Sequence, residues 1–229
     1  MLDVLVIAAH PDDAEIGAAG AILKCKADGM RVGVLDLTSG EPTPHGSLEI
    51  RQRETDAASA ILGLDWRENL GLPNRSLEAT LEARRQLAAV IRREKPRWLM
   101  THFWDDAHPD HVAACQLVEA ARFWSKLTKS DIPGDPHHPE KVLHFFSVHL
   151  KLLPQPDFVF DISPFWEKKI AAISAYESQF ITGRPTEPPT FVDRLQSAAA
   201  TMGTSIGTAY GEPYASREPI GLRSMRDLT

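Results

Sequence analysis

The chain has 229 residues, of which 43% are hydrophobic and 24% are charged, and its formal net charge at pH 7 is −6. This length suits one α/β domain around a single core, and the negative charge excludes a basic face that binds nucleic acid by neutralising phosphates. No apolar run reaches the roughly 18 residues of a membrane span, and the N-terminus lacks the basic region and cleavage site of a signal peptide. We therefore expect a cytoplasmic protein.

The two cysteines, Cys25 and Cys115, are far apart in the sequence and form no CxxC motif. They predict neither a disulfide framework nor a thiolate zinc site. Any metal ion is therefore expected to be held by histidine and carboxylate side chains.

Apolar strands alternate with helical patterns along the first hundred residues. Residues 2–9 are a nearly continuous apolar run, typical of a strand buried on both faces, and residues 15–29 have helical spacing that ends at an Asp-Gly pair. Further strands are predicted at 31–38, 66–70 and 97–102, helices at 48–62 and 77–94, and a loop at 39–47. This alternation predicts an α/β fold, a Rossmann-like doubly wound, mostly parallel sheet with helices on both faces.

The pattern is less regular in the second half of the chain. The expected elements are a helix at 110–124, a Pro/His/Asp-rich loop at 129–139, strands at 142–150 and 158–162, a helix at 164–180, turns at 182–189 and a helix at 190–202. The remaining residues are expected to be irregular. No repeat or linker interrupts the sequence, so we expect a single domain over residues 1–229.

Two polar motifs follow predicted strands. Ala-His-Pro-Asp-Asp-Ala-Glu at residues 9–15 follows the first strand, and Asp-Asp-Ala-His-Pro-Asp-His at residues 105–111 follows the fourth. In a sheet of order 3-2-1-4, strands one and four are neighbours at the point where the winding reverses, and ligands bind in the crevice that opens there. One such motif alone is usually only a capped loop. Two motifs at adjacent strand ends predict a shared cleft.

Two imidazoles and one carboxylate with an open position suit a catalytic zinc ion. His10, Asp13 and His111 can supply these groups, and we expect one Zn²⁺ per chain, although Fe²⁺ or another divalent ion also fits this set. Asp12 stands between two of the predicted ligands and is then free to act as a general base. A zinc-activated water with a neighbouring base predicts amide hydrolysis.

The second motif offers further groups. His108 is the candidate for stabilising the oxyanion or protonating the leaving amine, and Asp110 is the candidate for orienting an imidazole. Asp105 and Asp106 are interpreted as solvent-facing or capping residues. The other histidines are interpreted as surface or packing residues, with only His138 near the cleft: His45, His102, His137, His138, His144 and His149.

Both motifs resemble the signatures of the PIG-L or LmbE-like deacetylases, an AHPDD-x-E turn after the first strand and a later HPDH. Matched position by position, the resemblance implies metal ligands at His10, Asp13 and His111, a base at Asp12 and an auxiliary histidine at His108. The sequence is most similar to the N-acetylglucosaminyl-malate deacetylases of bacillithiol biosynthesis. The segments that carry this similarity are 36–38, 48–51, 67–75, 156–158, 175–180 and 210–214.

The resemblance implies removal of the N-acetyl group from an N-acetylglucosamine (GlcNAc) conjugate. The expected substrate is GlcNAc-malate, and chitobiose or an inositol conjugate are the alternatives. Arg51 matches an arginine of the family's active site, and a guanidinium suits the carboxylates of malate. Relatives carry an arginine near His138, and residues 40–46 differ in composition from theirs, which leaves the exact substrate open. The family is often oligomeric, commonly hexameric, so the resemblance implies a homo-oligomer that acts on a small molecule, without nucleic-acid or membrane partners.

Three other classes of protein compete with a deacetylase. A nucleotide-binding protein would use the same sheet, but the first strand–helix turn lacks GxGxxG and carries acidic side chains that repel phosphate. A non-haem iron oxygenase also uses two histidines and one carboxylate, and metal analysis of anaerobically purified protein would separate it. A catalytically inactive carbohydrate-binding relative is disfavoured because Asp12 is retained.

Overall fold

The computed structural model describes residues 1–149, 154–222 and 224. Its strands are β1 (Val4–Ala8), β2 (Val32–Thr38), β3 (Trp66–Leu72), β4 (Trp98–His102), β5 (Lys141–Phe145), β6 (Phe158–Asp161) and β7 (Gly211–Ala215). Its helices are α1 (Asp13–Ala27), α2 (Leu48–Leu62), α3 (Leu81–Glu94), α4 (Pro109–Ser125), the 3₁₀ turn η1 (Ser163–Phe165), α5 (Trp166–Ser174), α6 (Glu177–Phe180) and α7 (Phe191–Ser205).

The described strands form one sheet in the order β3-β2-β1-β4-β5-β7-β6. The pairings from β3 through to β5 are all parallel, whereas β7 runs antiparallel to both of its neighbours, β5 and β6. The predicted order 3-2-1-4 and the α/β, Rossmann-like class are therefore confirmed. β1 lies between β2 and β4, so the winding reverses there and a crevice opens beyond its carboxyl end.

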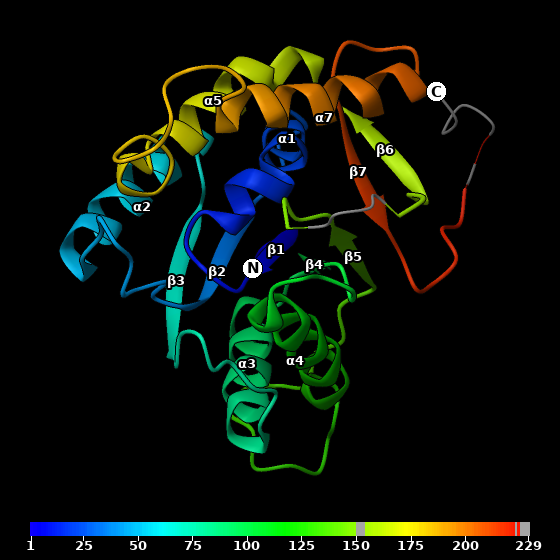
Figure 1. The fold of residues 1–229 in the computed structure, drawn as a ribbon. Helices are drawn as coiled ribbons and strands as arrows, with labels where there is room; N and C mark the ends of the chain where they lie inside the picture. Colours follow the sequence, from blue (N-terminus) through cyan, green and yellow to red (C-terminus); the bar gives the residue numbers. More distant parts are fainter. Residues whose placement is uncertain (150–153, 223, 225–229) are drawn as a thin grey trace.

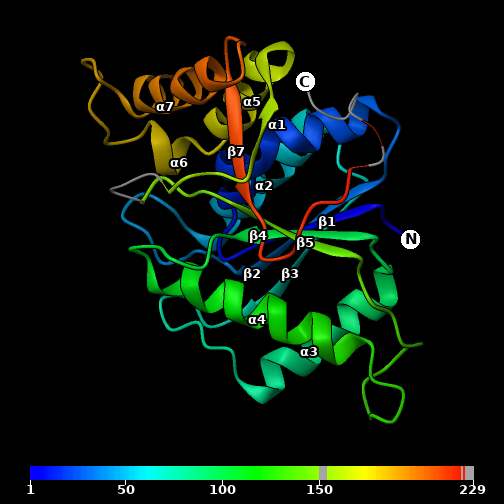
Figure 2. The same cartoon turned by 90° about the vertical axis from the view of Figure 1, so that its right-hand side faces the viewer.

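Helices cover both faces of the sheet, with α3 and α4 on one face and α1, α2, α5 and α7 on the other (Figures 1 and 2). Successive residues of β1 point to opposite faces. Leu5 and Ile7 belong to the core cluster that includes α3 and α4 residues, whereas Val4 and Val6 belong to the cluster that includes α1 residues. Because both faces are buried, the sequence of β1 is apolar at every position rather than at alternate ones.

The second half of the chain differs from the sequence prediction at three places. The strand expected at 142–150 ends at Phe145, and residue 150 lies outside the described part of the chain. The helix expected at 164–180 is divided into η1, α5 and α6, because Tyr176 has φ −86° and ψ 64°, outside the helical region.

The third difference is β7, which was expected to be irregular. Its sequence, Gly-Glu-Pro-Tyr-Ala, contains two residue types that disfavour strands. Pro213 pairs with Val159 of β6, but β5 pairs only with Tyr214 and Ala215. Pro213, which lacks an N–H, therefore lies outside the residues that pair with β5, where none of the described strands requires this donor.

Buried polar groups fasten β7 and α5 to α1. Glu212 of β7 is buried and accepts hydrogen bonds from the backbone N–H groups of Gly20 and Ala21, both at 2.9 Å. Lys169 of α5 contacts the same carboxylate at 2.6 Å and donates to the carbonyl of Ile16 at 2.7 Å. Glu212 and Lys169 thus bind backbone groups of α1. These contacts fix the antiparallel strands against the helix that starts at the first motif.

None of the helices in the described residues has the length and apolarity needed to cross a lipid bilayer.

Candidate active site

The two sequence motifs meet at the carboxyl edge of the sheet. His10 follows β1 and precedes α1, whereas His102 ends β4 and His108 caps the N-terminus of α4. The two strand ends are joined directly, because the backbone N–H of Ala9 donates to Nε2 of His102 at 2.9 Å. The convergence expected from strand order is therefore found in the structure.

Asp13 lies at the centre of this cluster and is almost fully buried. Its Oδ2 is 3.1 Å from Nδ1 of His10, and its Oδ1 is 3.3 Å from Nε2 of His111. Burial alone would raise the pKa of Asp13, but the charge of His111 holds it well below its usual value. Conversely, Asp13 and Asp106 overcome the effect of burial and raise the pKa of His111 to about 10.

The donor atoms near Asp13 form two overlapping groups that could hold a cation. One group is His10, His108 and His111, the other is Asp13, His102 and His111, and within each group the donor atoms lie within 4.8 Å of one another. The lone pair on Nε2 of His102 already accepts the Ala9 N–H, which removes this nitrogen as a ligand. Nitrogen and carboxylate donors of this kind suit zinc.

His102 was interpreted as an ordinary packing or surface residue, but it is part of the site. It is fully buried and stacks on the ring of His111, with a centroid distance of 4.1 Å. Burial, followed by the charge of His111, lowers the pKa of His102 to about 4, so the ring is neutral. Its place as the last residue of β4, at the same edge as both motifs, was the signal that could have identified it.

Two carboxylates contact the imidazoles. Asp110 Oδ2 lies 3.1 Å from Nε2 of His10 and also accepts the N–H of Arg75 at 2.8 Å. Asp106 was interpreted as solvent-facing or capping. Its side chain is buried, however, and while Oδ1 caps the N–H of His108 at 2.8 Å, Oδ2 lies 3.0 Å from Nδ1 of His111. Asp106 therefore contacts His111 as Asp110 contacts His10.

His108 lines the cavity next to these groups and stacks on His111 at a centroid distance of 4.6 Å. Its Nδ1 accepts the N–H of Asp110 at 3.2 Å, so the neutral ring carries its proton on Nε2. His149, interpreted as a surface or packing residue, lies 5.5 Å from the rings of both His108 and His111 and also lines the cavity. It belongs to no motif, and its sequence context gave no signal.

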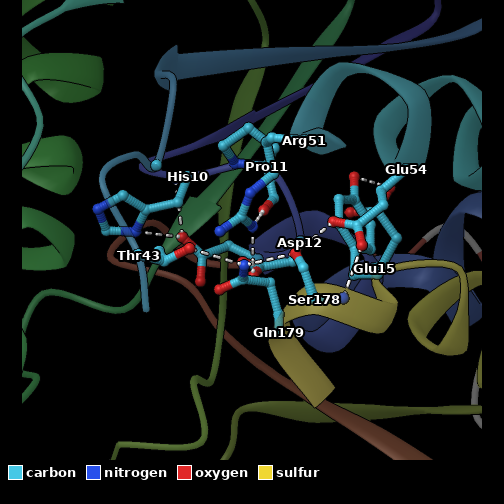
Figure 3. Close-up of polar contacts among 12 residues, drawn as sticks. His10, Pro11, Asp12, Glu15, Thr43, Arg51, Glu54, Ser178 and Gln179 are labelled. Atoms are coloured by element: carbon cyan, nitrogen blue, oxygen red, sulfur yellow. Dashed lines mark hydrogen bonds and ion pairs between the residues drawn. The ribbon is translucent and has the colours of Figure 1, made fainter. Parts of the chain in front are cut away.

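Asp12 occupies a strained backbone position at the start of α1, with φ 119°. Arg51 of α2 is buried beside it, as Figure 3 shows, and its Nη1 donates to Oδ2 of Asp12 at 3.0 Å and to the carbonyl of Pro11 at 2.7 Å. Its Nε donates to Oε1 of Glu41 at 3.2 Å. Burial, followed by the charge of Asp13, raises the pKa of Asp12 to about 7, while Arg51 opposes this rise.

A cavity of about 520 Å³ opens beside these groups. His10, Asp12, Asp13, Arg51, His108 and His111 line it. Three exposed arginines line it as well: Arg75, Arg184 and Arg194. The cavity therefore combines buried reactive groups with positively charged side chains that are open to solvent.

The helix α6 forms part of the cavity wall. Glu54 of α2 accepts hydrogen bonds from the N–H and the hydroxyl of Ser178, at 2.6 and 2.7 Å (Figure 3). Gln179 lines the cavity, and its Nε2 donates to Oγ1 of Thr43 at 3.1 Å. α2 thus has two contacts at the cavity. Arg51 positions the candidate base, Asp12, and Glu54 holds α6, which forms part of the cavity wall.

His138 was expected near the cleft, and this expectation is wrong. The loop that contains it precedes β5, which is parallel to β4, so the loop lies at the amino edge of the sheet. Arg122, in the last turn of α4, donates to the carbonyl of Pro139 at 2.9 Å, and the N–H of Glu140 donates to the carbonyl of Arg97 at 2.7 Å. His138 is exposed there, at the opposite edge from His10 and His111.

Comparison with known proteins identifies a family and a relative that are similar in sequence. The model of the family PIG-L: GlcNAc-PI de-N-acetylase matches residues 5–122, which include both motifs. The chain is 35% identical over 193 residues to the diacetylchitobiose deacetylase of Thermococcus kodakarensis, covering 77% of this chain and 70% of that protein.

Two solved structures have the same fold over most of their length. The conserved protein TT1542 from Thermus thermophilus matches with a TM-score of 0.89 and 38% identity, covering 97% of each chain. N,N′-diacetylchitobiose deacetylase from Pyrococcus horikoshii, complexed with its inhibitor, matches with a TM-score of 0.79 and 26% identity, covering 92% of this chain and 82% of that one.

Proposed function

Because this chain belongs to the PIG-L family of N-deacetylases, we propose that it hydrolyses the N-acetyl group of an N-acetylglucosamine conjugate. The proposed cofactor is one Zn²⁺, with His10, Asp13 and His111 as its ligands. The observation that carries this proposal is the junction of the two motifs, in which Asp13 lies 3.1 Å from His10 and 3.3 Å from His111. A bound Zn²⁺ would lower the pKa of water to about 7 and polarise the acetyl carbonyl.

The proposed general base is Asp12. It lies next to a proposed ligand and lines the cavity, and Arg51 holds one of its carboxylate oxygens at 3.0 Å. A carboxylate in this place can accept the proton of the attacking water, and a base with a pKa near 7 balances proton affinity against availability at neutral pH. Arg51 has a positioning role in this proposal because it fixes the orientation of the base.

His108 is proposed to donate a hydrogen bond to the oxyanion and a proton to the leaving amine. Its Nδ1 is occupied by the N–H of Asp110, so the neutral ring has an Nε2–H available for a ligand. Asp106 and Asp110 are proposed to fix the orientation of His111 and His10. Such carboxylate–histidine contacts maintain ligand geometry in metal sites.

The proposed substrate is GlcNAc-malate. Its support is the positive charge around the cavity, where Arg75, Arg184 and Arg194 are exposed and can pair with carboxylates. Arg51 is a weaker candidate for this contact, because its guanidinium already contacts Asp12 and Glu41. Diacetylchitobiose is the second candidate substrate, favoured by the 35% identity to a diacetylchitobiose deacetylase.

Acetate release from GlcNAc-malate, GlcNAc-inositol and diacetylchitobiose, measured with and without a chelator, tests this proposal. We expect release that the chelator abolishes and Zn²⁺ restores, with the highest kcat/KM for GlcNAc-malate. A preference for diacetylchitobiose would replace the proposed substrate and leave the chemistry in place. No acetate from any N-acetylated sugar by zinc-loaded protein would refute the deacetylase.

The identity of the metal requires a separate measurement, because two histidines and one carboxylate also suit Fe²⁺. Protein purified without oxygen and analysed for metals should contain zinc. Iron in an equimolar amount, with activity lost in air, would instead favour an iron-dependent enzyme.

A further inference from the structure

A second group of metal-binding side chains lies away from the candidate active site. It consists of Cys115 and Glu119, one turn apart on α4, and His144 on β5. Their donor atoms lie within 4.8 Å of one another. Cys115 and His144 are each 1% exposed, and Glu119 lies towards solvent with its side chain 30% exposed. Figure 2 shows α4 crossing the face of the sheet that contains β4 and β5.

His144 is the unusual member of this group. Among the residues that the structure describes, neither ring nitrogen has a hydrogen-bond partner of normal geometry, although Nε2 lies 3.3 Å from Oε1 of Glu119. Trp104 meets its ring edge-to-face at a centroid distance of 5.0 Å. Buried polar atoms are almost always hydrogen-bonded, because an unsatisfied group loses its contacts with water and gains nothing in return. A buried imidazole aimed at a carboxylate and a thiol therefore requires an explanation.

We propose that Cys115, Glu119 and His144 form a second site for a zinc-like divalent ion, separate from the site at the carboxyl edge of the sheet. Sulfur, nitrogen and oxygen donors together suit zinc, whereas Mg²⁺ and Ca²⁺ require oxygen ligands. Two donors on a tetrahedral zinc ion, with bonds of about 2.0–2.1 Å, are separated by about 3.3 Å. The separation of Nε2 of His144 and Oε1 of Glu119 is 3.3 Å.

The sequence alone pointed away from such a site because the chain has no CxxC motif. Here the spacing is helical instead, since residues four apart on a helix lie on the same face, and the third donor comes from a neighbouring strand. Burial, followed by the charge of Glu119, raises the pKa of the Cys115 thiol to about 12. The thiol is therefore protonated without an ion, and formation of the sulfur–metal bond releases this proton to solvent.

When no metal ion is bound, the positively charged side chain of Arg217 contacts Glu119 instead. Its Nε lies 3.1 Å from Oε1 of Glu119, and its guanidinium covers the ring of Trp104 at 4.7 Å. The Arg217 side chain is 51% exposed, so it can move into solvent without opening the core. Ion binding and the Arg217 contact thus compete for the same carboxylate oxygen.

Titration of the full-length protein with Cd²⁺ tests this site, because cadmium thiolates absorb in the ultraviolet while complexes with only nitrogen and oxygen ligands lack this band. We expect wild-type protein to bind two ions per chain by equilibrium dialysis and to develop the thiolate band. Cys115→Ala should bind one ion without the band. The matched control is Cys25→Ala, which removes the other free cysteine and should keep both.

Two further variants keep the test decisive if Cys115→Ala fails to fold. Glu119→Gln should weaken the second binding step at least tenfold, whereas Arg217→Gln should tighten it because the competing cation is removed. Absence of the thiolate band in wild-type protein, or its persistence in Cys115→Ala, would refute the site. Unchanged second-ion affinity in both Glu119→Gln and Arg217→Gln would refute it equally.

Discussion

Two buried arginines show how the two edges of the sheet differ. Arg51 lies at the carboxyl edge and is 4% exposed, and its contacts include the carboxylates of Asp12 and Glu41. Arg92 lies in the last turn of α3 near the amino edge and is 3% exposed, but its hydrogen bonds go to uncharged oxygens. These acceptors are the carbonyls of Ser125, Leu127, Ile132 and Gly134 and the hydroxyl of Ser130.

The comparison shows that the burial of an arginine carries no functional meaning by itself. Arg92 donates hydrogen bonds to carbonyl groups of the loop that follows α4, and so it fixes this loop against α3 at the amino edge of the sheet. Arg51 balances the buried carboxylate of Glu41 and the partly buried carboxylate of Asp12, which faces the cavity. The partners of the guanidinium therefore distinguish a structural arginine from one that acts on the chemistry.

The largest expected effect at the carboxyl edge is that of Asp12→Asn. Asparagine tolerates a positive φ as aspartate does, but it cannot accept a proton from water. We expect kcat for acetate release to fall roughly 10²- to 10⁴-fold. Metal content, measured on the same preparation, should stay at the wild-type level, whereas Asp13→Ala should lose the metal. Native turnover in Asp12→Asn would show that another group is the base.

Arg51→Met should affect both stability and turnover. It leaves the buried carboxylate of Glu41 and the partly buried carboxylate of Asp12 without their counter-charge, a change that costs roughly 3–5 kcal/mol of unfolding free energy. It also frees Asp12 from its contact at 3.0 Å, so we expect kcat to fall at least about tenfold. Denaturant unfolding and steady-state kinetics would measure the two effects. A stability loss with native kcat would place Arg51 in the same structural class as Arg92.

Arg92→Met should lower stability alone. Two buried and two partly buried carbonyls lose their donor, and we expect a loss of roughly 3 kcal/mol in unfolding free energy with kcat unchanged. The matched control is Arg85→Met on the same helix, because Arg85 pairs with Asp131, whose side chain is 82% exposed. That surface pair should contribute at most about 1 kcal/mol. A large fall in kcat for Arg92→Met would mean that the two edges are coupled.

The smallest expected effect is that of His138→Ala at the amino edge. His138 is exposed and lies at the far edge of the sheet from His10 and His111, so KM should be unchanged and stability should vary within about 0.5 kcal/mol. Substrate titration of the wild type and the variant would check this. A KM that is higher in His138→Ala than in the wild type would indicate that His138 contacts the substrate.

The sequence predicted the parallel part of the fold because its signals are local. The continuous apolar run of β1 and the helical spacing of α1 each follow from burial, and strand order alone brought the motifs at residues 9–15 and 105–111 together. β7 could not be predicted in this way. Its stability depends on Glu212, which binds backbone groups of α1 far away in the sequence, and this contact outweighs the poor strand preference of Gly and Pro.

The same limit applies to the site. The sequence could predict that His10, Asp13, His108 and His111 lie together because they stand in motifs at adjacent strand ends. The roles of His102 and Asp106 depend on where their rings and oxygens point, which residue type and spacing do not reveal. His138 was misplaced because an arginine of relatives near this position does not fix where the loop lies, whereas the direction of β5 decides the edge of the sheet.

The positive φ of Asp12 has a consequence for which residues this position can hold. Only glycine adopts such a backbone conformation at low cost, and a residue with a side chain stores roughly 1–3 kcal/mol of strain there. Glycine at position 12 would relieve this strain, but it would also remove the carboxylate from the cavity and take one of the two counter-charges from buried Arg51. The strain at this residue is therefore inseparable from its charge, because the substitution that relieves the backbone also removes a carboxylate that both Arg51 and the proposed chemistry use.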